Sequence, residues 1–550
     1  MPIIPVRGIA KLGVVTDMDP YNLPVGAWSM GVNVRFRNGD ITRAPVFRSV
    51  DPALSYGSPR FLSANSPSSG FDAIIVGYQN GRVTSITSGV ETDLSITAGG
   101  LGTAGVYLNA NAETSFTSCH LGDVFYVNRP DRAPWSFKVS DTVMHVLANW
   151  APVSSPWTCN ILRASNSALC AFGITQNGVS YPTMVITSEF AVVDTVPVTW
   201  DYTLGTNNAT SNVLGEMEGA ITDAQALGEI MIVYGLNETW TMVLDGSANI
   251  WAYHKLFKGY GALNANCAVE VDKQHFVFGP TDIWKHDGTT PISICDERTR
   301  EFIFSALNVS QANRCFVNYN ARLKEINFAY VSGDSYCAFN IGANGCNRQA
   351  TYHVPTNTWS FDDLPFIFGA TMASVNTVQT WASTTSVWAT VGGTWLDQAD
   401  SSKKVCVMVG DVSATYNLTE TLYAFDLQGP GSAVAFTVDT NATKGWALYR
   451  DGIDLDEVGA DLKGYKVLNS IYPQGRLEVG AQPITFSFGS ADYFNDAVVM
   501  STPQTWDASS LYKLDYNVSG RYLSMIVTHN DYHYAKLTGF DFDMDVLGER

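Results

Sequence analysis

Gly235-Leu-Asn-Glu-Thr-Trp240 and Gly279-Pro-Thr-Asp-Ile-Trp284 are two matching segments whose glycines lie 44 residues apart. Each segment starts with a glycine that ends an apolar run, passes through a polar turn and reaches a Trp in the next run. Gly and polar residues favour tight turns, whereas Trp favours strands. A repeat of roughly 40–50 residues with these features is typical of the four-stranded blades of a β-propeller. The pair therefore predicts a propeller.

Similar apolar runs recur on both sides of this pair, and the composition agrees with them. The 550 residues include 46 Gly, 25 Tyr, 27 Phe and 14 Trp, a mixture that favours short strands and tight turns. We therefore expect an all-β protein, with a large β-sandwich or stacked barrels as the alternative to a propeller. The irregular spacing of these runs predicts inserted loops. Residues 296–307 start with acidic residues and have apolar residues three and four apart, which predicts a short helix. The runs lie at 73–83, 123–128, 169–173, 230–235, 275–279, 325–330 and 387–390.

The N-terminal region carries a hairpin pattern. Residues 33–37 alternate polar and apolar side chains, which is the period of a half-buried strand. The Asn-Gly pair at 38–39 is a strong turn signal, and 41–43 has the pattern of the returning strand. We expect the following residues of the two terminal regions to support the fold or to hold subunits together: Trp28, Asn33, Arg35, Phe36, Arg521 and Tyr522.

Three regions follow along the chain. Residues 1–50 hold the hairpin, 51–400 the propeller and 401–550 a C-terminal strand-rich region, with a polar break at 401–404. We expect the two terminal regions to form a strand-rich platform.

The charge of the chain limits its partners. It has 33 Lys and Arg against 52 Asp and Glu, a net charge of −19. Affinity for nucleic acid comes mainly from neutralising phosphates, so this balance disfavours a protein that grips DNA. It is compatible with DNA that slides past without sticking, and equally with a charge that keeps an abundant protein soluble.

The cysteines and the first residues indicate where the protein is made. Nine cysteines without a Cys-x-x-Cys pair predict free, buried thiols and a reducing cytoplasm. Residues 1–7 lack the features of a signal peptide, and no stretch approaches the ~20 apolar residues of a membrane span. We expect a soluble protein made in the cytoplasm.

No motif indicates catalysis or a cofactor. The eight histidines are scattered without the spacing of metal ligands, and phosphate-loop, nucleophile-elbow and dinucleotide motifs are missing from the sequence. The acidic stretch at 451–457 lacks the order of a calcium loop, so a solvated loop is expected there. Asp541, Asp543 and Asp545 share one face of a strand, either simply exposed or facing a lumen. We expect no enzyme.

Several motifs occur in order along the chain, and together they resemble the tail nozzle (tail tubular protein B-like) family of short-tailed bacteriophages. Phage nozzle proteins are built around a β-propeller and stand as a six-copy ring below the portal and adaptor. The motifs are Leu-Pro-x-Gly-Ala-Trp at 23–28, Asn-Val-Arg-Phe-Arg-x-Gly at 33–39, Val-Tyr-Gly-x-x-x-x-Trp at 233–240, Tyr-Gly-Ala at 260–262, Phe-x-x-Gly-x-x-Asp-Ile-Trp-x-x-Asp-Gly at 276–288 and Ser-Gly-Arg-Tyr-Leu at 519–523.

The resemblance implies a structural virion protein of the phage tail, assembled in the host bacterial cytoplasm. Its ring extends the DNA channel, retains the genome and opens for DNA ejection. The implied partners are further copies of the chain in a hexamer, portal-adaptor proteins, tail fibres or spikes, the passing genomic DNA and a host outer-membrane receptor. The alternatives are a propeller-type glycan-binding or glycan-cleaving tail protein for host recognition, and a bacterial propeller scaffold.

Overall fold

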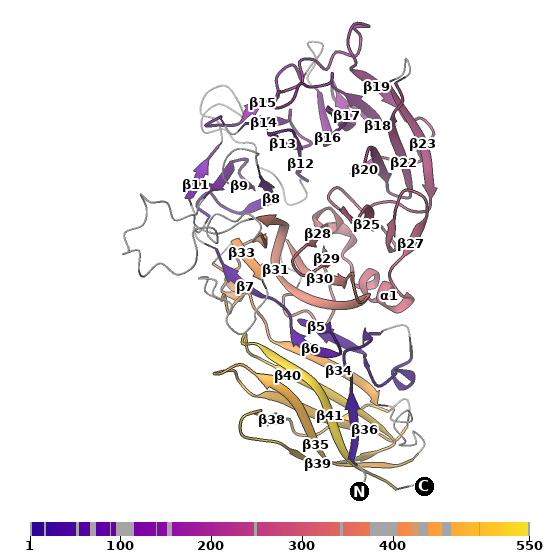
Figure 1. Ribbon diagram of the computed structural model, residues 1–550, viewed down its shortest axis with the longest axis vertical. Coiled ribbons are helices and arrows are strands. Elements are labelled where there is room, and N and C mark those ends of the chain that lie inside the picture. Colours follow the sequence, from indigo (N-terminus) through magenta and orange to yellow (C-terminus); the bar gives the residue numbers. More distant parts are fainter. Residues whose placement is uncertain are drawn as a thin grey trace, which may run out of the picture.

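The computed structural model consists of a ring of sheets joined to a smaller β-sandwich, with both chain ends at the far end of the sandwich (Figure 1). The ring is a β-propeller, and we call the sandwich the platform. The structure describes residues 3–15, 18–50, 54–66, 73–87, 90–94, 115–138, 140–150, 157–246, 250–340, 345–373, 404–419, 422–426, 438–453, 464–493 and 496–547.

Five blades of the propeller are separate four-stranded antiparallel sheets, each formed by consecutive strands. Blade 1 is β8 (Pro59–Asn65), β9 (Ala73–Tyr78), β10 (Val83–Thr87) and β11 (Val90–Asp93). Blade 2 is β12 (Thr117–Leu121), β13 (Val124–Asn128), β14 (Trp135–Phe137) and β15 (His145–Val146). Blade 3 is β16 (Trp157–Ser165), β17 (Ala168–Gln176), β18 (Val179–Thr187) and β19 (Thr210–Val213). Blade 4 is β20 (Ile221–Leu227), β21 (Ile230–Gly235), β22 (Glu238–Leu244) and β23 (Trp251–Lys258). Blade 5 is β24 (Ala268–Val271), β25 (Gln274–Phe278), β26 (Ile283–His286) and β27 (Pro291–Ser293).

Blades 6 and 7 share one long strand, β31 (Thr358–Ala373). Its first half is the outer strand of blade 6, and its second half is the inner strand of blade 7. Phe366, with a φ of +54°, lies where the strand changes partners. Blade 6 also contains β28 (Phe316–Asn320), β29 (Glu325–Tyr330) and β30 (Cys346–His353). Blade 7 continues with β32 (Val405–Gly410), β33 (Leu422–Asp426) and the N-terminal β7 (Val46–Ser49).

The seven described blades close into a ring because their inner strands contact one another in sequence, from β12 through β16, β20, β24 and β28 to β31 and then β8. Blades 1 and 2 meet through the hydroxyls of Ser63 and Ser118, 3.0 Å apart. The outer strand of blade 7 comes from the N-terminal region, so the two ends of the propeller chain are joined within one sheet.

The platform is a sandwich of two sheets that pack through aromatic side chains. Phe486 and Phe488 of one sheet lie with ring centroids 6.0 Å from Phe540 and Phe542 of the other. The first sheet is β39 (Leu514–Gly520), β35 (Lys466–Leu477), β41 (Ala535–Val546), β6 (Asp40–Arg43) and β5 (Val34–Arg37), with β1 (Ile3–Arg7) also on β41. The second is β4 (Met30–Val32), β34 (Trp446–Ile453), β40 (Tyr522–His529) and β36 (Ile484–Ala491), with β37 (Val499–Met500) and β38 (Gln504–Trp506) on β36.

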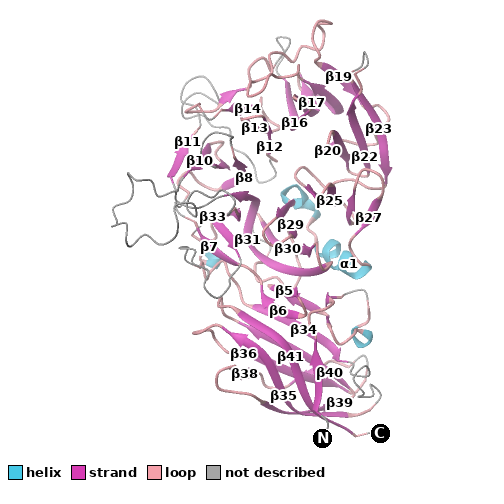
Figure 2. Cartoon of the chain, viewed as in Figure 1, coloured by secondary structure: helices cyan, strands magenta, loops and turns pink. Residues whose placement is uncertain are grey.

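Helices are few and short (Figure 2). The side chain of Asp296 caps the helix α1 (Glu297–Ala306) by accepting a hydrogen bond from the backbone N–H of Thr299, as expected for an acidic residue at a helix start. The remaining small elements are the 3-10 helices η1 (Pro20–Asn22), η2 (Val309–Arg314) and η4 (Ala414–Tyr416), and the parallel pair β2 (Gly13–Val14) and β3 (Ala27–Trp28).

The predicted fold class is confirmed: the protein is all-β, with a propeller, inserted loops, a short helix and a platform formed by the terminal regions. Trp240 and Trp284, the markers of the repeat, occupy the third strands of blades 4 and 5. The predicted hairpin is β5 and β6, with positive φ at Asn38 and Gly39. The expected boundary near residue 400 falls inside blade 7, because β32 and β33 belong to the propeller.

Candidate functional site

The predicted assembly residue Arg35 lies where the platform meets the propeller. Its Nη1 and Nη2 donate to Oδ1 and Oδ2 of Asp362 on β31, at 2.6 and 2.7 Å. Its Nε donates to Oε1 of Glu325 on β29, at 2.7 Å. All three side chains are buried. A planar guanidinium suits this geometry because it fits a carboxylate with two parallel hydrogen bonds.

Further groups complete the network around Arg35. Burial alone would lower the pKa of Arg35, but the charges of Asp362 and Glu325 raise it above its usual value. Arg37 also donates to Glu325, and Gln349 and Thr351 donate to Asp362. Asp362 and Glu325 of blade 6 are therefore paired with cations from the platform hairpin.

Asn33 forms a second connection between the platform and the propeller. Its backbone has a φ of +56°, in the left-handed region that Asn tolerates better than most residues. Its Nδ2 donates to Oδ2 of Asp363 at 2.9 Å, and its Oδ1 accepts from the backbone N–H of Asp363 at 2.9 Å. Asp363 also accepts from Nη1 of the fully buried Arg348 at 2.9 Å. Adjacent strand residues point to opposite faces, so Asp362 and Asp363 anchor the platform from both faces of β31.

Backbone pairing also connects the platform to the propeller. Phe361 of β31 pairs in parallel with Val32 of β4, and β4 pairs with β34 of the platform. One sheet therefore runs from blade 6 into the platform without interruption. We call this contact, formed by Asn33, Arg35, Glu325, Asp362 and Asp363 with the β31–β4 pairing, the junction.

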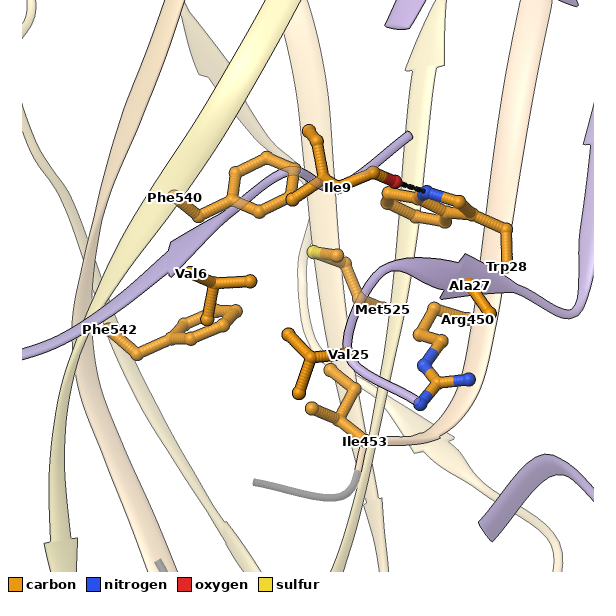
Figure 3. Close-up of a pocket in the computed structure, with 10 residues that line it drawn as sticks. All are labelled: Val6, Ile9, Val25, Ala27, Trp28, Arg450, Ile453, Met525, Phe540 and Phe542. Atoms are coloured by element: carbon orange, nitrogen blue, oxygen red, sulfur yellow. Dashed lines mark hydrogen bonds between the residues drawn. The ribbon is translucent and has the colours of Figure 1, made fainter. Parts of the chain in front are cut away.

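Trp28 and Phe36, two other predicted residues, lie in the platform core. The indole Nε1 of Trp28 donates to the carbonyl of Ile9 at 2.6 Å, and its ring meets Phe540 edge-on (Figure 3). The ring of Phe36 packs on Gly13 and Gly31, where a Cβ would lie within 3.4 Å of it. Trp28 borders a cavity of about 20 Å³, room for about one water, lined by Val6, Ile9, Val25, Ala27, Trp28, Arg450, Ile453, Met525, Phe540 and Phe542.

Arg521 and Tyr522 lie apart from the junction, where β39 leads into β40. The carbonyl of Arg521 accepts from Nζ of Lys466 at 3.2 Å, and Tyr522 pairs with Ala491 of β36. Of the six predicted residues, the structure thus brings Asn33 and Arg35 together at the junction, with Trp28 and Phe36 in the neighbouring core.

A buried cluster of Tyr234, His275 and His286, between blades 4 and 5, was missed by the sequence analysis. Tyr234 Oη lies 2.6 Å from His275 Nδ1 and 2.8 Å from His286 Nε2. His275 Nε2 is 2.8 Å from the carbonyl of Ala226, and the N–H of Gly288 donates to His286 Nδ1 at 3.1 Å. These neighbours assign one donor and one acceptor nitrogen to each imidazole, so both are neutral.

The environment of the cluster keeps the histidines neutral. Burial lowers the pKa of His275 to about 4 and of His286 to about 3. The charge of Asp287 offsets part of the lowering of the pKa of His286. Burial raises the pKa of Tyr234, and the charge of Asp223 raises it further. The cluster fastens two blades by hydrogen bonds. Its members are far apart in sequence and on different strands, so no spacing rule marks them.

The axis of the propeller is crossed by Arg163, Asp223 and Asn266. Arg163 Nη2 donates to Asp223 Oδ1 at 2.7 Å, and the backbone N–H of Asn266 donates to Asp223 Oδ2 at 2.9 Å. Asn266 Nδ2 then donates to the carbonyl of Phe116 at 2.8 Å, which links the start of blade 5 to blade 2. We call these three residues the axial plug.

Other sequence features have plain structural settings. Asp541, Asp543 and Asp545 alternate with the buried Phe540, Phe542 and Met544 on β41, and accept hydrogen bonds from Gln474, Ser470 and Asn469, respectively. Residues 454–457 of the acidic stretch lie outside the described residues. Within the described ranges, no group of three or more His, Cys, Asp or Glu side chains is placed to hold a metal ion, and no helix is long and apolar enough to cross a membrane.

Comparison with known proteins leaves the family open. No family model and no curated protein matches the chain. Among solved structures, the computationally designed Ika8 protein is 10% identical, with a TM-score of 0.31 over 59% of this chain and 84% of that chain. A mitotic checkpoint complex is 10% identical, with a TM-score of 0.32 over 57% of this chain and 85% of that chain. Similarity at this level carries no conclusion about function.

Proposed function

We propose that this protein is a structural, non-enzymatic tail protein of a short-tailed bacteriophage, the subunit of a nozzle ring. Six copies would surround the DNA channel below the portal and adaptor, retain the genome and open for its ejection. The observation that carries the proposal is the junction. The hairpin with the motif that resembles nozzle proteins supplies the side chains that lock the platform to the propeller.

A platform and a propeller that are locked together suit a tail component that has to retain the genome under pressure. In such a ring, platform and propeller move together, because the junction combines buried ion pairs with a continuous sheet. Ring closure also covers sheet edges that a single copy exposes. The net charge of −19 supports a channel wall that repels the DNA backbone, so that DNA slides without sticking.

The axial plug determines where the channel runs in this proposal. Because Arg163, Asp223 and Asn266 cross the propeller axis, DNA passes between copies of the chain and not through one propeller. The gate that retains the DNA is then formed by several copies of the chain together and not by a single propeller.

The proposal is tested by cryo-electron microscopy of particles that carry the protein, together with its copy number per particle. We expect a six-fold ring on the tail axis, around DNA, with the propellers off the axis. A peripheral trimer would overturn the proposal and favour the competing function, a glycan-binding or glycan-cleaving tail protein. A basic channel wall would overturn the sliding mechanism while leaving the ring in place.

A further inference from the structure

A small cavity lies beside the junction, where the platform meets blades 6 and 7. Its volume of about 10 Å³ is room for a single water-sized ligand. Every residue that lines it except Lys444 is buried, so the cavity lies below the protein surface. The lining residues are Asn33, Arg43, Ala44, Pro45, Phe47, Asp362, Asp363, Phe425, Thr443 and Lys444.

Arg43 contributes a hydrogen-bond donor to this cavity. The residue is only 6% exposed. Its Nη1 donates to the carbonyl of Asp531, and its Nη2 donates to the carbonyl of Lys444. Its Nε forms no hydrogen bond with any other residue that the structure describes. A buried donor on a charged group is costly to leave unpaired, so Nε of Arg43 needs an acceptor within the cavity.

Asp363 contributes an acceptor from the propeller side. Its Oδ2 accepts from Asn33 Nδ2 at 2.9 Å, and a carboxylate oxygen can accept a further hydrogen bond. The carboxylate lies near Lys444, because burial lowers the pKa of Lys444 and the charge of Asp363 offsets part of that shift. The carboxylate of Asp362 instead faces Arg35, on the opposite side of β31.

Thr443 contributes a third polar group. Its Oγ1 accepts from the backbone N–H of Phe47 at 2.9 Å and donates to the carbonyl of the same residue at 3.3 Å. A hydroxyl oxygen has two acceptor positions, so this oxygen can accept one more hydrogen bond. The cavity therefore offers one donor and two acceptors, and a buried water typically forms about three hydrogen bonds.

The charges around the cavity disfavour an ion. The cations of Arg43 and Lys444 oppose a metal ion, and the carboxylates of Asp362 and Asp363 oppose an anion. A neutral ligand that both donates and accepts suits the two sides at once. Water is the ligand of this class that a cavity of this size admits.

We propose that this cavity is a binding site for one water molecule. The water accepts from Nε of Arg43 and donates to the carboxylate of Asp363 and to Oγ1 of Thr443. It joins β6 of the platform to β31 of blade 6, and so adds a third connection to those that Arg35 and Asn33 form. The site belongs to the folded chain alone and does not depend on the nozzle proposal.

A crystal structure of the full chain, at a resolution that shows ordered waters, tests the proposal. We expect one density peak at about 2.7–3.2 Å from both Nε of Arg43 and the carboxylate of Asp363. Crystals grown with bromide in place of chloride should show no anomalous signal at this peak. A cavity without a peak, a peak out of reach of Nε, or a bromide signal overturns the proposal.

A pair of variants tests the polarity of the cavity in solution. Ala44→Ser adds a hydroxyl to the lining, where it can bind the water or replace it among the same polar partners. The matched control is Ala424→Ser, which adds the same hydroxyl to an apolar core cluster. Ala44 is 3% exposed and Ala424 is 1% exposed, so burial is nearly equal at the two positions.

The two variants should differ in their urea unfolding midpoints. We expect Ala424→Ser to lower the midpoint, because its hydroxyl is buried without a partner, and Ala44→Ser to lower it at most about half as far. A shift in Ala44→Ser as large as that in the control, or larger, overturns the proposal. Because both experiments use the isolated chain, such a failure leaves the nozzle proposal standing.

Discussion

Arg35 and Asp362 are 327 residues apart in the chain and form a two-pronged ion pair, with N–O distances of 2.6 and 2.7 Å. The pair joins the N-terminal hairpin to the strand that blades 6 and 7 share. Glu325 on β29 accepts from the same guanidinium, so one cation contacts two buried carboxylates, and Arg37 also donates to Glu325.

Replacing Arg35 should destabilise the protein strongly. Arg35→Ala leaves Asp362 buried without its cation and leaves Glu325 with Arg37 alone, which costs about 3–5 kcal/mol of unfolding free energy. Arg35→Lys should recover part of this loss, because an ammonium keeps the charge but not the two-pronged geometry. Urea unfolding measures both, with the exposed Arg476→Ala as control. A loss in Arg35→Ala no larger than in the control would show that the ion pair does not hold the junction.

Two variants separate the two roles of Asn33. Asn33→Gly keeps the left-handed backbone but removes the hydrogen bonds to Asp363, for a loss of about 1.5–3 kcal/mol. Asn33→Ala adds backbone strain of about 1 kcal/mol, because alanine disfavours a φ of +56°. Denaturant unfolding of the two variants measures the difference between their unfolding free energies. An Asn33→Ala variant that is as stable as Asn33→Gly would contradict backbone strain at this position.

The Tyr234–His275–His286 cluster should make stability depend on pH. Its histidines have pKa values of about 4 and about 3, below the usual value of ~6.5 in the unfolded chain. As pH falls below about 6.5, the unfolded chain binds protons first, so the stability present at neutral pH is lost. Two such groups give a slope of up to about 2.7 kcal/mol per pH unit near pH 5.

Unfolding in urea between about pH 7 and 5 measures this slope. The double variant His275→Gln/His286→Gln should be less stable at neutral pH and should lose this part of the slope. The other histidines are common to both proteins and cancel in the comparison. Equal slopes in the two proteins would show that the cluster does not titrate as its geometry requires.

Phe47 should control the closure of the propeller. Its ring packs on Phe425, with centroids 4.9 Å apart, and β7 is held in blade 7 by its pairing with β33. Phe47→Ala should cost about 3–5 kcal/mol and should raise hydrogen exchange of the β33 amides before other blades. Phe36→Ala, equally buried but in the platform, is the matched control. The same exchange pattern in both variants would argue against a closing role for β7.

The features predicted from the sequence are those with local signals. The hairpin at Asn38 and Gly39, the helix that Asp296 caps and the Trp-bearing third strands of two blades all depend on residues close in the chain. Alternation of side chains likewise predicted that Asp541, Asp543 and Asp545 share one face. The fold class follows from the sum of such signals.

The junction and the histidine cluster depend on contacts that the chain makes across long distances. Arg35 lies in a sequence motif, but nothing near Asp362 or Glu325 in the sequence indicates which cation they bind. The place of β7 in blade 7 was also beyond prediction, because the four residues Val46–Ser49 carry no sign of a partner some 375 residues later. Pairing between strands that are far apart in the chain depends on how side chains pack in the folded core, and local sequence signals do not show that packing.

The course of β31 has a mechanical consequence. Its first half is joined to β30 and, through β4, to the platform, and its second half is joined to β32. A pull on the platform reaches β31 through the Phe361–Val32 pairing and through the side chains of Asn33 and Arg35, and β31 passes the load to β30 on one half and to β32 on the other. A force on the platform is therefore carried into two neighbouring blades at once and not into one blade alone.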